Sequence, residues 1–329
     1  MHPLFGDLLG RRQAVPCLFY PVVREIGLTV SQALTDPAAQ VRVFEHTART
    51  YPVGAVVRMT ELWCEAAACG MACEMPDGGF PQLGGPLCEE ADALAGLAFP
   101  DVENAVTAPL LEAVRRGAQV LDRPLIAGMT GPYTLGAVLG GSEDFMMNCM
   151  TDPEPIHAFL SHATAFLTAY ARAYRDAGAA GILIAEPSTA MISPDMMAEF
   201  SNRYLNQVIE AVQDDTFAVI YHNCGAVNPH LETISTLQAA AFHFGSDVDL
   251  SRAAAVIPDR PILGNLDPRR FLATNPDIPG ETAAQRARYG GLAHWIPSTG
   301  CDLPPAVSPG AAHAFVTAMS GDWRSLVHL

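Results

Sequence analysis

The sequence predicts an α/β protein, a single (β/α)8 TIM barrel that spans residues 1–329 and carries a long insertion after its second strand. Three observations lead to this prediction. Short apolar runs of the buried-strand type recur along the chain, and longer helical patterns separate them. Half of the residues are hydrophobic and only 16% are charged, which is enough apolar material for a large core. A length of 329 residues is ordinary for one such barrel.

Eight apolar runs are expected to form the strands. Each lacks a clean alternation of polar and apolar residues, which is the pattern of a strand covered on both faces. Eight strands that alternate with helices favour a closed parallel barrel over an open sheet. In chain order the runs are residues 15–19, 55–59, 124–128, 181–185, 217–221, 239–244, 261–264 and 292–296.

Helical patterns lie between these runs. Residues 155–176 follow Asp152 and Pro153, a common way for a helix to begin, and residues 194–213 begin at a proline. The stretch 65–101 is long for one crossover, so we expect an inserted lid or hairpin there. The chain has no low-complexity segment, solenoid repeat or Ser/Gly-rich linker, and we therefore expect one domain.

The charge and the chain start restrict the possible partners and the compartment. A formal net charge of −16 argues against nucleic acid and against anionic membrane surfaces, since both attract clustered Lys and Arg. No apolar stretch reaches the roughly 18 residues that a spanning helix needs. The first residues lack the basic and apolar segments of a signal peptide. We therefore expect a cytoplasmic protein whose eight cysteines are thiols or ligands rather than disulfides.

Three residues form the clearest chemical pattern, a set of zinc ligands. His222 and Cys224 stand two residues apart at the end of an apolar run, and Cys301 lies far downstream in a glycine-flanked turn. Structural zinc sites usually have four protein ligands, whereas a catalytic zinc keeps one position open for water or substrate. The distant third ligand favours a catalytic zinc. On spacing alone, a packed histidine and cysteines without a metal remain the alternative.

Polar residues follow several predicted strands, at the end of a barrel where the loops carry the chemistry. Glu186 is the best candidate for an oxygen ligand or an acid/base group, with a solvated strand-end carboxylate as the alternative. Asp247 is a candidate for direct chemistry or for organising its loop. The same end of the predicted barrel holds Glu61, Thr130 and Asn265, and Tyr133 in a turn that we expect to line the pocket.

These motifs resemble the uroporphyrinogen decarboxylase superfamily and, within it, the zinc-dependent methylcobamide:coenzyme M methyltransferases. The resemblance covers nearly the whole chain from about Asp36 onward. Its specific element is His222-Asn223-Cys224-Gly225 with the later Gly300-Cys301 pair, because these are the zinc ligands of that branch. Landmarks shared with relatives of other activities are Glu65-Ala66-Ala67-Ala68-Cys69-Gly70, Gly131-Pro132-Tyr133-Thr134, Ala185-Glu186-Pro187 and Gly264-Asn265-Leu266-Asp267-Pro268.

The resemblance implies an enzyme that moves a methyl group from a methylated corrinoid, such as methylcobalamin, to a thiol such as coenzyme M. It also implies a corrinoid protein as the partner that carries the methyl donor, and it leaves the oligomeric state open. By the resemblance, Zn²⁺ is held by His222, Cys224 and Cys301. From their positions in the predicted barrel we expect Glu186, Glu61 and Asp247 to be the catalytic residues, and Thr130, Tyr133 and Asn265 to contact the corrinoid.

The chain departs from the family pattern at two kinds of position. The decarboxylases grip porphyrin carboxylates with an Arg-rich segment near the N-terminus, and this chain has only Arg11-Arg12-Gln13-Ala14 there, which disfavours decarboxylation. Glu61 and Glu186 stand where many relatives have Asp, which puts the geometry in doubt. The alternatives are a non-catalytic barrel that binds corrinoid or zinc, a uroporphyrinogen decarboxylase, and a methyltransferase that uses tetrahydrofolate, whose known examples generally lack the zinc ligands.

Overall fold

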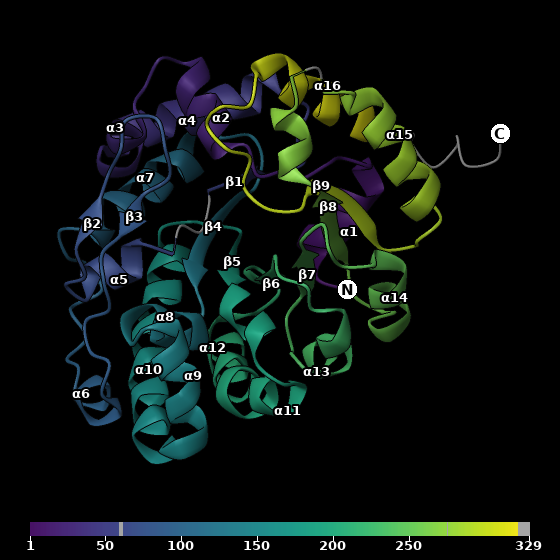
Figure 1. Ribbon diagram of the computed structural model, residues 1–329. Coiled ribbons are helices and arrows are strands. Elements are labelled where there is room, and N and C mark those ends of the chain that lie inside the picture. The colour runs from purple at the N-terminus through teal and green to yellow at the C-terminus, as the bar shows by residue number, and fades with distance from the viewer. Residues whose placement is uncertain (59–61, 275, 322–329) are drawn as a thin grey trace.

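A curled, seven-stranded parallel sheet surrounded by helices forms the centre of the protein in a computed structural model that describes residues 1–58, 62–274 and 276–321 (Figure 1). This arrangement confirms the predicted α/β class with its TIM-barrel type of sheet. The neighbours in the sheet follow chain order. Its strands in the described residues are β1 (Val56–Val57), β4 (Leu125–Thr130), β5 (Gly181–Ala185), β6 (Ala218–Asn223), β7 (Ala241–Phe244), β8 (Ile262–Leu266) and β9 (Trp295–Thr299).

Four strands, β4, β6, β8 and β9, end later than the sequence predicts. β6 continues through His222 and Asn223, and β9 continues through Ser298 and Thr299. The predicted runs ended before His222 and Pro297, but a strand is held by backbone hydrogen bonds that do not depend on side-chain polarity. These four residues are buried. The carboxyl-terminal residues of β6 and β9 are therefore polar and buried in the core.

The predicted first strand, residues 15–19, is wrong. No strand is present in this segment, and α2 (Phe19–Glu25) begins within it. The backbone of the segment is nevertheless bonded to β9, since Val15 N donates to Pro297 O at 2.9 Å, and the preceding Ala14 O accepts from the N–H group of Gly54, two residues before β1, at 2.8 Å. Proline has no N–H group, so Pro16 cannot continue a ladder of such bonds. Two side-chain hydrogen bonds, from Ser298 Oγ to Val15 O at 2.7 Å and from Cys17 N to Thr299 Oγ1 at 3.1 Å, also join the segment to β9 where an eighth strand was expected.

Proline residues begin many of the surrounding helices, as a residue without an N–H group suits the first turn. The predicted helix 155–176 is α10 (Pro153–Asp176). The predicted helix 194–213 is divided into α11 (Pro194–Met197), a π-helical turn (Ala198–Asn202) and α12 (Arg203–Val212). The other main helices are α1 (Pro3–Arg11), α3 (Val30–Thr35), α4 (Pro37–Thr50), α7 (Thr107–Val120), α8 (Pro132–Leu139), α9 (Ser142–Thr151), α13 (Leu231–Ser235), α14 (Leu250–Val256), α15 (Ile278–Tyr289) and α16 (Pro309–Met319).

The long insertion after the predicted second strand is confirmed. It contains α5 (Cys64–Ala68), a small antiparallel hairpin of β2 (Cys73–Glu74) and β3 (Gln82–Leu83), and α6 (Ala91–Ala95). In Figure 1 these elements run along one side of the molecule, next to α8 and α10. None of the helices in the described ranges combines the length and apolar character that a bilayer crossing requires.

Candidate metal centre

Three metal-ligating side chains meet at the carboxyl ends of β6 and β9. His222 is the fifth residue of β6, Cys224 directly follows that strand, and Cys301 lies two residues beyond β9. Their ligand atoms all lie within 4.8 Å of one another, and Cys301 Sγ is 3.8 Å from His222 Nε2. It is the one group of this kind among the described residues. Two strands separate β6 from β9 in the sheet, so the curl of the sheet brings the ligands together.

The separations suit a zinc ion. Zn–S bonds of about 2.3 Å and Zn–N bonds of about 2.0–2.1 Å place the ligand atoms of a tetrahedral site roughly 3.5–3.8 Å apart. The distance from Cys301 Sγ to His222 Nε2, 3.8 Å, falls in this range. Two sulfurs and one imidazole nitrogen are also ligands that zinc prefers. Three protein ligands leave the fourth position of a tetrahedral ion open.

His243 holds the His222 ring in the tautomer that a metal ligand needs. The Thr299 carbonyl oxygen, which can only accept, lies 2.8 Å from His243 Nε2, so this nitrogen carries the hydrogen. Burial lowers the pKa of His243 well below its usual value, so the ring is neutral. His243 Nδ1 therefore accepts from His222 Nδ1 at 2.7 Å. The lone pair of His222 is thus on Nε2, the nitrogen that faces Cys301.

The two ligand thiols interact with each other, and this interaction shifts their pKa values in opposite directions. The Cys301 thiol donates to the Cys224 sulfur, which lowers the pKa of Cys224 and raises that of Cys301 well above its usual value. Burial opposes the ionisation of both groups. Two thiolates within 4.8 Å of each other would repel. A dication between the sulfurs would stabilise both as thiolates, so the pair is electrostatically suited to a metal.

Glu186 supports the ligand strand through its backbone. The Glu186 N–H group donates to the carbonyl oxygen of His222 at 2.9 Å, and the Glu186 carbonyl oxygen accepts from Asn223 Nδ2 at 2.6 Å. Since Asn223 lies between His222 and Cys224, these bonds fix the segment that carries two ligands. Glu186 is not part of the group of metal-ligating atoms that the described residues form.

The Glu186 carboxylate binds the first turn of α8. Its oxygens accept from the backbone N–H groups of Tyr133 at 3.1 Å and Thr134 at 2.8 Å, an arrangement that suits the positive end of a helix. Burial raises the pKa of Glu186 to about 7, and the hydrogen bonds from Thr134 and Tyr133 oppose this shift. Gly131 makes room for the carboxylate, because a Cβ atom there would lie 2.4 Å from Glu186 Cδ.

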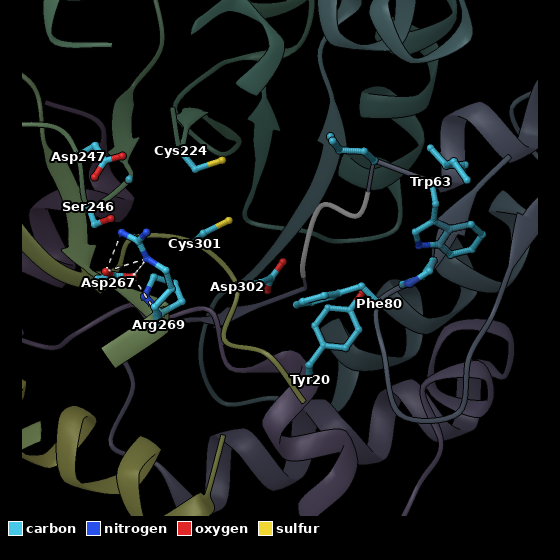
Figure 2. Close-up of a pocket in the computed structure, with 16 residues that line it drawn as sticks. Tyr20, Trp63, Phe80, Cys224, Ser246, Asp247, Asp267, Arg269, Cys301 and Asp302 are labelled. Carbon is cyan, nitrogen blue, oxygen red and sulfur yellow. Dashed lines mark hydrogen bonds and ion pairs between the residues drawn. The ribbon is translucent and has the colours of Figure 1, made fainter. Parts of the chain in front are cut away.

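A cavity of about 640 Å³ opens beside the two ligand sulfurs. Figure 2 shows the sulfurs of Cys224 and Cys301 pointing into it. A cavity of this size that combines apolar walls with a few polar groups is typical of a small-molecule site. Its aromatic lining residues are Tyr20, Trp63 and Phe80, and its charged lining residues are Asp247, Asp267, Arg269 and Asp302.

Two of the predicted site residues have structural contacts away from this cavity. Thr130 is buried, and its N–H group donates to Glu65 Oε1 at 3.3 Å. The Tyr133 ring packs edge-on against Phe145, with the ring centroids 5.2 Å apart. Neither residue lines the 640 Å³ cavity. The predicted site residue Glu61 lies outside the described residues.

Asp247 lies in the loop that follows β7, whereas Asn265, which was expected to follow a strand, lies within β8. Asp247 lines the sulfur cavity and also a neighbouring cavity of about 360 Å³. Asn265 lines only the second of these. Asn265 Nδ2 donates to the carbonyl oxygens of Gly245 at 2.9 Å and Val248 at 2.8 Å, so it holds the loop that carries Asp247.

The aromatic wall and His243 are the parts of the site that sequence reasoning missed. Tyr20 belongs to α2, Trp63 precedes α5, and Phe80 lies between β2 and β3. Trp63 lies in the loop between β1 and α5 and Phe80 lies in the predicted insertion, so the position of these segments, and no residue pattern, pointed towards them. A signal for His243 was available, because the register pairs it with His222 in the neighbouring strand.

The chain is similar to two kinds of enzyme. The sequence model of the uroporphyrinogen decarboxylase (URO-D) family matches residues 12–321. The uroporphyrinogen decarboxylase of Dichelobacter nodosus is 26% identical over 279 residues, which cover 82% of this chain and 79% of that protein. The methylcobamide:CoM methyltransferase MtbA of Methanosarcina mazei is 26% identical over 184 residues, 55% of this chain and 53% of that protein.

The solved structures include a methyltransferase from Methanosarcina mazei that has the same fold. It superposes with a TM-score of 0.84 at 22% identity, over 97% of this chain and 98% of that one. A B12-independent methionine synthase from Shewanella is more distant, with a TM-score of 0.62 at 11% identity over 94% of each chain. Both likenesses concern the fold.

Proposed function

The chain belongs to the uroporphyrinogen decarboxylase family, and on that premise we propose that it is a zinc-dependent methyltransferase that moves a methyl group from a methylated corrinoid to a thiol. The observation that carries the proposal is the group formed by His222, Cys224 and Cys301 in the wall of a substrate-sized cavity. The similarity to the methylcobamide:CoM methyltransferase MtbA supports the same branch of the family. The methyl donor would be a corrinoid protein that docks at the cavity mouth.

The residues of the centre account for the activation of a thiol. Zinc, when bound, lowers the pKa of a coordinated thiol, so that the thiolate forms at neutral pH. His222 Nε2 and the sulfurs of Cys224 and Cys301 would hold the ion, and the two thiolates would donate electron density to it. His243 keeps the His222 lone pair on Nε2. The acceptor thiol would enter from the cavity, on the side to which both sulfurs point.

The methyl transfer itself is a displacement at carbon. The acceptor would lose its S–H proton to water on binding. A sulfur lone pair would then form the new S–C bond, while the Co–C bond of the methylated corrinoid would break and leave its electron pair on the corrinoid. We propose that Glu186 acts as a positioning residue in this reaction, because its backbone holds His222 and Asn223 and its carboxylate orients α8.

Uroporphyrinogen decarboxylation is the second candidate, because the family model and several relatives carry that name. A porphyrinogen has several carboxylates, which a protein usually binds with arginine. Among the described lining residues of the cavity, Arg269 is the one arginine, and it pairs with Asp267 at 3.0 Å. The charge of the cavity thus supports methyl transfer over decarboxylation.

A zinc assay on protein purified without added metal tests the proposal. We expect about one zinc per chain, and a large loss of zinc in Cys301→Ser. The matched control is Cys88→Ser, since Cys88 is equally half-exposed but lies outside the ligand group. Protein without stoichiometric zinc, or zinc that Cys301→Ser leaves unchanged, contradicts the proposal.

The activity is tested by the cobalamin spectrum. Methylcobalamin should lose its methyl group when the zinc-loaded enzyme and a thiol are both present, and tetrahydrofolate should not replace the thiol. Binding of methylcobalamin without demethylation would indicate a non-catalytic carrier. Turnover of uroporphyrinogen that continues after zinc is chelated would instead support the decarboxylase.

A further inference from the structure

The charges around the cavity are mostly negative. Among the residues that the structure describes, its charged lining residues are three aspartates and one arginine. That arginine, Arg269, is 76% exposed and is held by Asp267, with Nε 3.0 Å from Oδ1 and Nη2 3.0 Å from Oδ2. The chain contains no lysine that could add a second cation. In the described lining, the single cation, Arg269, is therefore already paired with a carboxylate of the same wall. An anionic ligand would have to compete with that carboxylate.

The arginines of the neighbouring 360 Å³ cavity are engaged as well. Arg270 lies 3.6 Å from Glu281, and Arg288 lies 3.3 Å from Asp249. Both arginines are more than half exposed. They do not line the sulfur cavity, so they do not change the balance of charge around a small molecule bound next to Cys301.

The wall opposite Arg269 combines aromatic rings with a carboxylate. Tyr20 and Phe80 pack edge to face with their centroids 4.7 Å apart, and Trp63 lies on the same side of the cavity (Figure 2). Asp302 directly follows the ligand Cys301, and Figure 2 shows its carboxylate between the sulfurs and the aromatic side chains. The faces of aromatic rings carry negative electrostatic potential and attract cations. A carboxylate beside such rings strengthens that preference.

We propose that the natural acceptor is a small aminothiol, whose sulfur faces Cys224 and Cys301 and whose ammonium group lies between Asp302 and the aromatic wall of Tyr20, Trp63 and Phe80. This inference rests on the proposed methyltransferase function and specifies its substrate class. An acceptor with a sulfonate tail, such as coenzyme M, would place its negative charge beside the carboxylate of Asp302. The Coulomb energy that favours an ammonium there opposes a sulfonate by a similar amount.

Three thiols of equal length test the charge preference. Cysteamine, 2-mercaptoethanol and coenzyme M share the HS–CH2–CH2 unit and end in a positive, a neutral and a negative group. Binding to the zinc-loaded full chain is measured by calorimetry, and binding to the cobalt-substituted chain by the sulfur-to-cobalt absorption band. We expect cysteamine to bind best and coenzyme M worst, with roughly tenfold between the extremes at low salt. The difference should shrink as the ionic strength rises.

Neutralising Asp302 separates the effect of the cavity from the intrinsic acidity of each thiol. For each protein, the affinity for cysteamine is divided by the affinity for coenzyme M, and this ratio is compared between the natural chain and Asp302→Asn. The acidity of each thiol affects both ratios equally, so it cancels in the comparison. We expect the ratio to fall severalfold in Asp302→Asn. Asp176→Asn is the control, because it removes the same charge from the exposed carboxyl end of α10, outside the cavity.

The outcomes distinguish this inference from the proposed function. Coenzyme M that binds as tightly as cysteamine, or a ratio that Asp302→Asn leaves unchanged, overturns the aminothiol assignment even if methyl transfer occurs. If Asp302→Asn loses zinc, the aminothiol assignment is tested by the order of the three thiol affinities on the natural chain alone. A chain that binds no zinc and demethylates methylcobalamin with none of the three thiols contradicts the proposed function instead.

Discussion

At the scale of single residues, the centre depends on a histidine that does not touch the metal position. His243 is 1% exposed, and both of its ring nitrogens are engaged, one with Thr299 O and one with His222 Nδ1. This leaves His222 one protonation pattern, in which Nε2 is the free ligand atom. Partners of this kind commonly change metal affinity by 10–100-fold when they are removed.

We predict that His243→Phe lowers zinc affinity by roughly 10–100-fold. Phenylalanine fills a similar volume but cannot accept the hydrogen of His222 Nδ1, so the His222 ring loses its fixed tautomer. The zinc dissociation constant is measured by chelator competition, and urea unfolding of the zinc-free protein shows whether the fold is retained. His162→Gln, on an exposed position of α10, is the control. Unchanged zinc affinity in a folded His243→Phe protein would show that His222 is oriented by the backbone alone.

At the scale of elements, the start of α8 connects the helical layer to the ligand strand. The carboxylate of Glu186, at the end of β5, accepts from two N–H groups of the first turn of α8, while its backbone bonds to His222 in β6. Two features make this possible. Gly131 has no Cβ at the point of closest approach, and Pro132 begins the helix without an N–H group of its own.

Gly131→Ala should destabilise the protein by about 1–3 kcal/mol, as other insertions of a methyl group into a filled interior do. The added Cβ would lie 2.4 Å from Cδ and Oε1 of Glu186, so the side chain or α8 must move. The free energy of unfolding in urea measures the effect. Gly6→Ala in α1 is the control, because nothing lies within 4 Å of its added Cβ, and alanine there should raise helix stability slightly. Equal stabilities of the two variants would contradict the close approach of Glu186 to the start of α8.

At the scale of the whole molecule, two fully buried carboxyl groups make stability depend on pH. Burial raises the pKa of both Glu65 and Glu186 to about 7, from an ordinary value near 4.5. The folded chain then binds these protons more tightly than the unfolded chain. Their contribution to stability is fully present below about pH 4.5 and is lost as the pH rises towards 7.

We therefore predict that the free energy of unfolding of the zinc-free chain falls as the pH rises from 4.5 to 7. The free energy of unfolding of Glu65→Gln should fall less steeply over the same interval. The difference in slope should approach one proton, which amounts to about 2–3 kcal/mol over this interval. Urea unfolding at a series of pH values, with a chelator present, gives the slopes. Glu112→Gln is the control, because arginine neighbours lower the pKa of this exposed carboxylate, outside the interval. A Glu65→Gln slope equal to that of the natural chain would show that Glu65 is ionised in the fold.

The fold class and the possible metal ligands could be predicted from the sequence. The ends of some strands and the structure of residues 15–19 could not, for physical reasons. Seven strands could be located from short, continuous apolar runs. A strand that is buried on both faces needs apolar residues at successive positions, and this pattern is visible in the sequence. The ends of β6 and β9 were placed too early, since backbone pairing continues through buried polar residues. Residues 15–19 have the composition of a strand, but Pro16 cannot donate a ladder hydrogen bond.

The sequence by itself determined which residues could bind zinc, because a His-x-Cys pair and a distant Cys are a matter of residue type and spacing. Only the tertiary structure decided what surrounds them. Tyr20, Trp63, Phe80 and Asp302 meet at one cavity because the sheet curls and the insertion folds beside α8. Contacts between residues so far apart in the chain are fixed by the packing of the whole molecule, and no local pattern encodes them.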